Sequence, residues 1–153
     1  MAFKKILCAV DFSNESIEGL KRAIDLARQS SSARLFILHA LEAQPVFSQY
    51  LPPEGLGEIT VELQEKAHES MEQLVEQFKS KLKDLNFKTQ VSSGRGFEEI
   101  LENANVWGAD LIVVGSHGSA GLDQVVLGST TGRVLERAPC SVLIVRPPQE
   151  SVK

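Results

Sequence analysis

The chain has 153 residues, 42% of them hydrophobic, and its 16 basic and 20 acidic side chains give a formal net charge of −4. This length and composition predict one folded domain, residues 1–147 with a short tail at 148–153, and exclude a disordered chain. Without an apolar run of about 18 residues we expect no membrane span, and without a basic stretch we expect no nucleic-acid partner.

The first half of the chain alternates short apolar runs with longer amphipathic ones, as βα units do. A continuous apolar run at 6–10 predicts a strand buried on both faces, and Ser13 is placed to cap the helix after it. A second strand is predicted at 35–40. Residues 42–57 are rich in proline and glycine and predict a long loop of a kind that is often functional, before a long amphipathic helix resumes near residue 58.

The second half continues the same alternation. A weak strand pattern at 87–91 precedes a turn at Gly94-Arg95-Gly96 and a helix, and the strongest strand pattern lies at 111–114. A Gly/Ser-rich loop and another helix follow, and a strand at 142–145 ends the pattern. We therefore predict an α/β fold, a three-layer α/β/α sandwich with a parallel sheet of five strands. If the first strand is central and the fourth lies beside it, the strand order is 3-2-1-4-5.

Cys8 and Cys140 are the two cysteines of the chain. Neither belongs to a CxxC pair, and both lie in or beside apolar strand patterns. This arrangement favours buried free thiols in a reducing compartment. Because no signal-peptide pattern follows the first residues, we expect a cytoplasmic protein.

Polar residues follow the first and fourth predicted strands. In an open parallel α/β sheet, ligands bind at the carboxyl ends of the strands, where the winding reverses direction. With the strand order above, that point lies between Asp11 and the segment Gly115–Gly118. Two interpretations of Asp11 stay open: its carboxylate accepts hydrogen bonds from a ribose, or it caps the next helix together with Ser13.

The glycines after the fourth strand indicate a phosphate site. Two residues separate Gly115 from Gly118, nine separate Gly118 from Gly128, and Ser129 opens the last helix. Glycine lets the backbone approach a phosphate closely, and the first amides of a helix are unpaired donors that attract anions. We expect a phosphate at the amino end of the last helix, although glycine loops and hydroxyl caps also occur for structural reasons alone.

The spacing from Gly115 to Ser129 resembles the G-2x-G-9x-G-(S/T) signature of ATP-binding universal stress proteins. The likeness extends to Asp11-Phe12-Ser13, to the strand ending in His39-Ala40 and to the terminal strand 140–145, and so covers essentially the whole chain. It implies an adenine nucleotide alpha hydrolase-like fold that binds ATP, with Mg²⁺ carried by the nucleotide. The implied site residues are Ala9, Val10, Asp11 and Ala40 around adenine and ribose, Val114 and Gly115 alongside, and Gly118, Gly128, Ser129, Thr130 and Thr131 around phosphate and ribose.

Three positions depart from the common pattern of that family. The first strand is followed by Asp11 without the usual proline, Ala40 stands where valine is common, and the turn at 94–96 also lacks a proline. Ala40 is smaller than valine, so we expect it to pack less tightly against an adenine.

The favoured function is an ATP-binding sensing module of the stress response, with no catalytic residue assigned. Two alternatives stay open: a slow ATPase or nucleotidyl-transfer enzyme, and an interaction module whose site is empty or holds another ligand. An enzyme needs a base or a water-orienting group, and none stands out. We expect His117 to be a turn residue or phosphate neighbour and the scattered histidines to form no metal site.

Four further side chains have expected structural roles. We expect His39 to be hydrogen-bonded at the end of its strand, His68 to be solvated, and Arg95 and Arg133 to form surface salt bridges.

The terminal strand Val142–Val145 is predicted at a sheet edge and lacks lysine or proline to protect it. We therefore expect a homodimer that pairs two such strands, as the resemblance also suggests.

Overall fold

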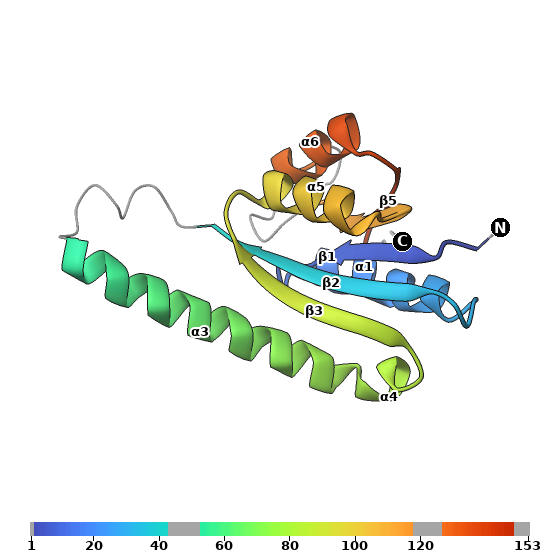
Figure 1. Cartoon of the computed structure of the whole chain (residues 1–153), viewed down its shortest axis with the longest axis horizontal. Helices are drawn as coiled ribbons and strands as arrows, with labels where there is room; N and C mark the ends of the chain where they lie inside the picture. Colours follow the sequence, from blue (N-terminus) through green and yellow to red (C-terminus); the bar gives the residue numbers. More distant parts are fainter. Residues whose placement is uncertain (1, 43–52, 118–126, 149–153) are drawn as a thin grey trace, which may run out of the picture.

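A parallel sheet forms the middle layer of the computed structural model, which describes residues 2–42, 53–117 and 127–148 (Figure 1). In these residues the order of the five strands is β3-β2-β1-β4-β5, and every neighbouring pair is parallel, as predicted. The strands are β1 (Lys5–Ala9), β2 (Arg34–Leu41), β3 (Asn86–Ser93), β4 (Leu111–Gly115) and β5 (Ser141–Val145).

Helices cover both faces of the sheet, which confirms the three-layer sandwich (Figure 1). One face carries α1 (Asn14–Ala27), α3 (Pro53–Gln77) and α4 (Lys79–Leu82), and the other carries α5 (Gly96–Trp107) and α6 (Ser129–Arg137). None of the helices within the described parts of the chain is long and apolar enough to cross a membrane.

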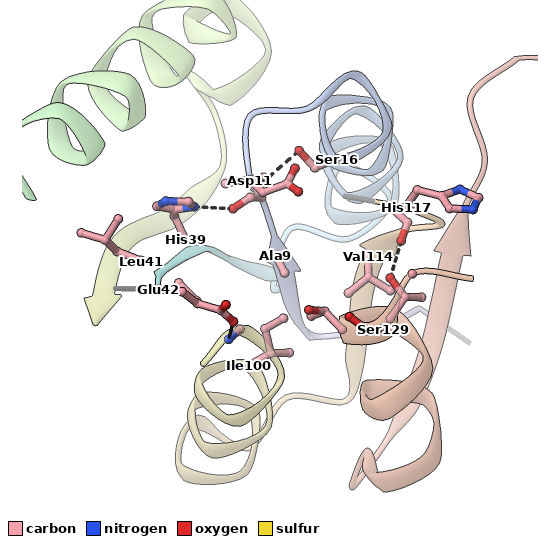
Figure 2. A pocket seen from close by; sticks show the side chains of 17 residues that line it. Ala9, Asp11, Ser16, His39, Leu41, Glu42, Ile100, Val114, His117 and Ser129 are labelled. Atoms are coloured by element: carbon pink, nitrogen blue, oxygen red, sulfur yellow. Dashed lines mark hydrogen bonds between the residues drawn. The ribbon is translucent and has the colours of Figure 1, made fainter. Parts of the chain in front are cut away.

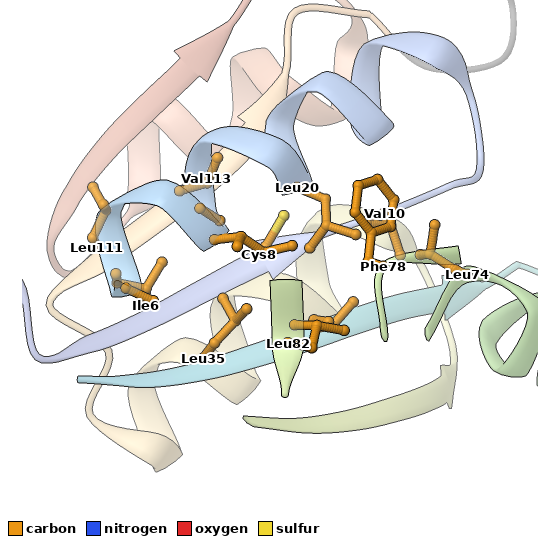
Figure 3. Close-up of a cluster of buried hydrophobic side chains, with 14 of the residues drawn as sticks. Ile6, Cys8, Val10, Leu20, Leu35, Leu74, Phe78, Leu82, Leu111 and Val113 are labelled. Carbon is orange, nitrogen blue, oxygen red and sulfur yellow. The ribbon is translucent and has the colours of Figure 1, made fainter. Parts of the chain in front are cut away.

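Strand β1 is buried on both faces because it lies at the centre of the sheet. Ile6 and Cys8 point into the core beneath α1, α3 and α4, whereas Leu7 packs with Phe36 under α5 and α6. Figure 3 shows the first of these cores, in which Cys8 lies between Ile6 and Val10. Such two-sided burial is why the sequence reads as a continuous apolar run. It also raises the pKa of the Cys8 thiol to about 12, so this thiol stays protonated.

Both cysteines are free thiols, as expected. Cys140 is only partly buried, and the loss of solvent and the nearby Asp110 carboxylate raise the pKa of its thiol, against a hydrogen bond with the Ile112 backbone that lowers it. Neither thiol is therefore an activated nucleophile.

The element boundaries differ from expectation in two places. Helix α3 begins at Pro53 and not near residue 58; proline is favoured in the first turn of a helix because its fixed φ suits it and no amide is lost. Strand β3 spans Asn86–Ser93, longer than the predicted 87–91, and its middle residues are exposed at the sheet edge, which weakens the apolar signal. Residues 43–52 of the expected loop and 149–153 of the tail lie outside the described residues.

Candidate functional site

A cavity of about 460 Å³ opens at the carboxyl ends of β1, β2 and β4 (Figure 2). Strands β1 and β4 are neighbours, but the helix after β1 lies on one face of the sheet and the helix before β4 on the other. The winding therefore reverses between them, which is where parallel sheets bind ligands. The lining residues are Ala9, Val10, Asp11, Ser16, His39, Ala40, Leu41, Glu42, Gly96, Ile100, Val114, Gly115, His117, Gly128, Ser129, Thr130 and Thr131.

The structure brings together ten of the eleven residues that the sequence singled out. These ten line the one cavity: Ala9, Val10, Asp11, Ala40, Val114, Gly115, Gly128, Ser129, Thr130 and Thr131. Gly118, the eleventh, lies outside the described residues.

The ends of β1 and β2 form an apolar wall that hydrogen bonds hold in place. The Val10 amide donates to the Leu38 carbonyl (2.8 Å), and His39 Nδ1 donates to the Val10 carbonyl (2.7 Å). His39 is thus hydrogen-bonded at the end of its strand, as predicted. Its ring also lies against Phe12, with 4.6 Å between the ring centroids.

Asp11 lies where the chain turns sharply from β1 into α1. Phe12 adopts a φ of 65°, a left-handed conformation that is uncommon for a bulky residue and must be held by its surroundings. The Asp11 carboxylate accepts from the Ser13 amide (3.0 Å) and from the Ser13 hydroxyl, while Ser13 Oγ accepts from the Ser16 amide (3.3 Å) as the predicted cap of α1. Ser13 is therefore the cap of α1, and the Asp11 carboxylate, which holds Ser13, also lines the cavity.

Helix α6 points its amino end at the cavity. Its cap is Gly128, which has no side chain to occupy the free amides, and the Gly128 amide donates to the Ser116 carbonyl (3.0 Å). The Thr131 hydroxyl donates to the Gly115 carbonyl (2.8 Å) and so ties α6 to the end of β4. Ser129 and Thr130 line the cavity in the first turn of the helix, where backbone amides have no acceptor within the helix, an arrangement suited to an anion.

Three elements contribute lining residues that the sequence does not indicate: Ser16 in α1, the residues at the end of β2, and the first turns of α5. The Glu42 carboxylate, just after β2, accepts a hydrogen bond from the Gly96 amide at the start of α5. Gly96 and Ile100 bring the first turns of α5 to the cavity (Figure 2). The carboxyl-end rule, applied to β2 as well as to β1 and β4, points to Leu41 and Glu42. No spacing in the sequence connects the Gly96 turn with the site.

His117 lies at the edge of the cavity, and its ring points away from the centre (Figure 2). The residue is 7% exposed, and Nδ1 lies 3.3 Å from the Ser116 hydroxyl. Nε2 is buried without a hydrogen-bond partner among the described residues. This position suits a turn residue better than a group that reaches a substrate.

The structure also describes His68, Arg95 and Arg133, for which the sequence predicts structural roles. His68 is exposed on α3, as predicted. Arg95 forms a surface pair with Glu98 (4.0 Å), also as predicted. The predicted salt bridge of Arg133 is not seen among the described residues: its guanidinium lies over the Phe97 ring, 4.7 Å from the centroid, and none of the described carboxylates is within ion-pair distance.

Comparisons of the sequence and of the structure with known proteins point to the same family. The model of the universal stress protein family matches residues 2–146. Universal stress protein MJ0531 of Methanocaldococcus jannaschii is 33% identical over 151 residues, which cover 97% of this chain and 85% of that protein. The structure of MJ0577 from the same organism superposes with a TM-score of 0.84 at 27% identity and covers 98% of this chain and 100% of its own.

A third solved structure is that of a universal stress protein from Archaeoglobus fulgidus in complex with dAMP. It superposes with a TM-score of 0.62 at 19% identity, and the match covers 95% of this chain and 99% of that one. At this identity the likeness shows a shared fold.

Proposed function

The chain belongs to the universal stress protein family, and we propose that it binds an adenine nucleotide, ATP above all, as a sensing module of the stress response. The observation that carries this proposal is the meeting of an apolar wall and a helix amino end in one cavity of about 460 Å³. Ligand cavities of about 300–1,000 Å³ of this mixed character hold small molecules in other proteins. The free thiols Cys8 and Cys140 support a cytoplasmic location.

The apolar wall suits a flat, weakly polar ring. Ala9, Val10 and Ala40 supply small side chains at the strand ends, and Ile100 approaches from α5. An adenine placed there would have both faces of its ring removed from water. The burial of apolar surface is the main source of affinity for such a ring. The dAMP bound by the Archaeoglobus fulgidus protein of the same fold supports an adenine ligand.

The amino end of α6 suits the phosphates. Its first amides, which have no acceptor within the helix, and the hydroxyls of Ser129 and Thr130 are donors, and the helix dipole adds positive potential. Mg²⁺ would come with the phosphates, because this ion usually keeps several waters and needs only one or two protein carboxylates. Asp11 and Glu42 are carboxylates on the cavity wall that fit this requirement.

The walls favour binding over catalysis. Rapid phosphoryl transfer needs a group that orients the nucleophile as well as donors that hold the phosphates. Asp11 and Glu42 already accept hydrogen bonds from the backbone amides of Ser13 and Gly96, and His39 donates to the Val10 carbonyl. Donors that hold the ground state and the transition state equally do not accelerate chemistry.

The nucleotide released from freshly purified protein tests the proposal. We expect mass spectrometry of the denatured, filtered protein to detect an adenine nucleotide, and titration calorimetry of the stripped protein to detect binding of ATP. The matched control is Val106→Asn, because Val106 is 82% exposed and does not line the cavity. This variant should bind ATP as the parent does.

Two results would contradict the proposal in different ways. Absence of adenine nucleotide together with no heat of binding for ATP would favour an interaction module with another ligand or none. Phosphate release near the typical enzymatic range of about 1–10³ s⁻¹, lost in His117→Ala while ATP affinity stays the same, would make the protein an ATPase.

We also propose a homodimer in which two β5 strands lie side by side. Strand β5 pairs only with β4, so in the described sheet it is an edge, and Val142, Leu143 and Ile144 are all partly exposed. An apolar unprotected edge favours pairing with a second copy. Light scattering at micromolar concentration should give the mass of a dimer for the parent and of a monomer for Val142→Lys. A monomeric parent, or a dimer that Val142→Lys leaves intact, would contradict the arrangement.

A further inference from the structure

A second cavity, of about 310 Å³, adjoins the first at the amino ends of α5 and α6. It is lined by Glu42, Arg95, Phe97, Ser129, Thr130 and Arg133. Ser129, Thr130 and Glu42 line both cavities, so the two spaces share a wall. We propose that the second cavity receives the terminal phosphates of a nucleotide whose first phosphate lies at the amino end of α6. This inference rests on the adenine-nucleotide site proposed above.

Arg133 is available to bind an anion in this cavity. Its guanidinium stacks on Phe97 at 4.7 Å, which orients the planar group without neutralising its charge. Among the residues described, no carboxylate pairs with it. A stacked guanidinium still presents its N–H groups in plane, in the geometry that binds two phosphate oxygens.

Arg95, the cap residue at the amino end of α5, adds a second charge to the lining of the cavity. Its pair with Glu98 is long (4.0 Å), and the two side chains are 70% and 56% exposed. Exposed pairs of this kind contribute little and exchange readily for another anion. A phosphate would therefore meet two arginines with no strong internal partner to displace.

Glu42 shows that the amino end of α5 accepts an anion. Its carboxylate accepts the Gly96 amide hydrogen bond, at the wall between the two cavities. A Cβ built on Gly96 would lie 3.2 Å from Glu42 Oε1 and 3.3 Å from Thr130 Cγ2, so these three residues meet closely. A phosphate beside Thr130 is therefore repelled by the Glu42 carboxylate, while the arginines attract it. Removing the charge of Glu42 should therefore raise the affinity for the terminal phosphates, and removing the charge of Arg133 should lower it.

The test compares AMP with ATP by titration calorimetry, in EDTA so that no divalent cation contributes. Arg133→Gln keeps most of the side-chain stem over Phe97 and removes the charge. We expect it to weaken ATP binding about tenfold, the low end of the range for one charge-assisted contact because Arg133 is exposed, and to change AMP binding less than about twofold. Glu42→Gln should strengthen ATP relative to AMP severalfold.

Arg137→Gln is the matched control. Arg137 lies one turn further along α6 and also approaches Phe97, at 5.9 Å, but does not line the cavity. It should leave the ratio of ATP to AMP affinity unchanged. The inference fails if Arg133→Gln weakens AMP and ATP equally, if Arg137→Gln has the same effect as Arg133→Gln, or if Glu42→Gln lowers the ratio. If neither AMP nor ATP binds the parent protein, both the proposed function and this inference fail. That result differs from the three outcomes above, which contradict this inference alone.

Discussion

Replacing Thr130 with aspartate should lower the affinity for ATP about a hundredfold or more. Thr130 lines the cavity in the first turn of α6, and the new carboxylate would lie where the phosphates are proposed to bind. Like charges brought together in a partly buried site cost several kcal/mol, and about 2.7 kcal/mol corresponds to a hundredfold. Titration calorimetry with ATP measures this loss.

The fold should survive that substitution, which makes the result interpretable. An acidic residue in the first turn of a helix interacts favourably with the helix dipole. Thr130→Asn is the control, because it has the same shape as aspartate without the charge, and it should lose less than about tenfold. Circular dichroism should show equal helix content in both variants. ATP affinity that is equal in Thr130→Asp and Thr130→Asn would refute a phosphate at this end of α6.

Replacing Gly115 with alanine should destabilise the whole protein. A Cβ at this position would lie 2.9 Å from the carbonyl carbon of Glu15 and 3.1 Å from its oxygen, atoms of the α1 backbone that cannot rotate away. Overpacking of this kind costs about 1–3 kcal/mol. For a chain of this size the melting temperature should fall by about 2–4 °C for each kcal/mol, as measured by thermal denaturation.

Gly132→Ala is the matched control with the opposite sign. Gly132 lies inside α6, and among the described residues no heavy atom outside its own stretch of helix lies within 4 Å of a built Cβ. Alanine there should raise the free energy of unfolding by up to about 1 kcal/mol, because glycine is the poorer helix former. A Gly115→Ala protein as stable as Gly132→Ala would show that β4 and α1 can separate without cost.

The strength of each sequence signal followed the burial of the element. Strands β1 and β4 are covered on both faces, so the runs at 6–10 and 111–114 predicted them plainly. Strand β3 exposes Lys88, Thr89 and Gln90 at the sheet edge, and its pattern predicted only the middle of the strand. Its full length is set by pairing with β2 from Arg34 to Leu41, a long-range contact that local periodicity does not contain.

The sequence likewise predicts only part of the candidate site. Residues at strand ends and in the glycine pattern, such as Asp11, Gly115 and Gly128, could be predicted, because parallel strands bring their carboxyl ends to one edge. The meeting of Glu42 with Gly96 joins residues 54 positions apart and depends on how α5 lies on the sheet. The stacking of Arg133 on Phe97 also joins two helices, and no spacing in the sequence indicates it.

The central place of β1 also has a consequence for the order in which the protein folds. The ribosome makes β1 well before one of its two neighbours, β4, which begins only at Leu111. Until β4 emerges, β1 has an open edge and Leu7 lacks Ile112, one of its core partners. Pairing across so many residues is slow because a large loop must close first. Until β4 has been made, the nascent chain therefore exposes an apolar strand edge, a state in which chaperones bind and aggregation competes with folding.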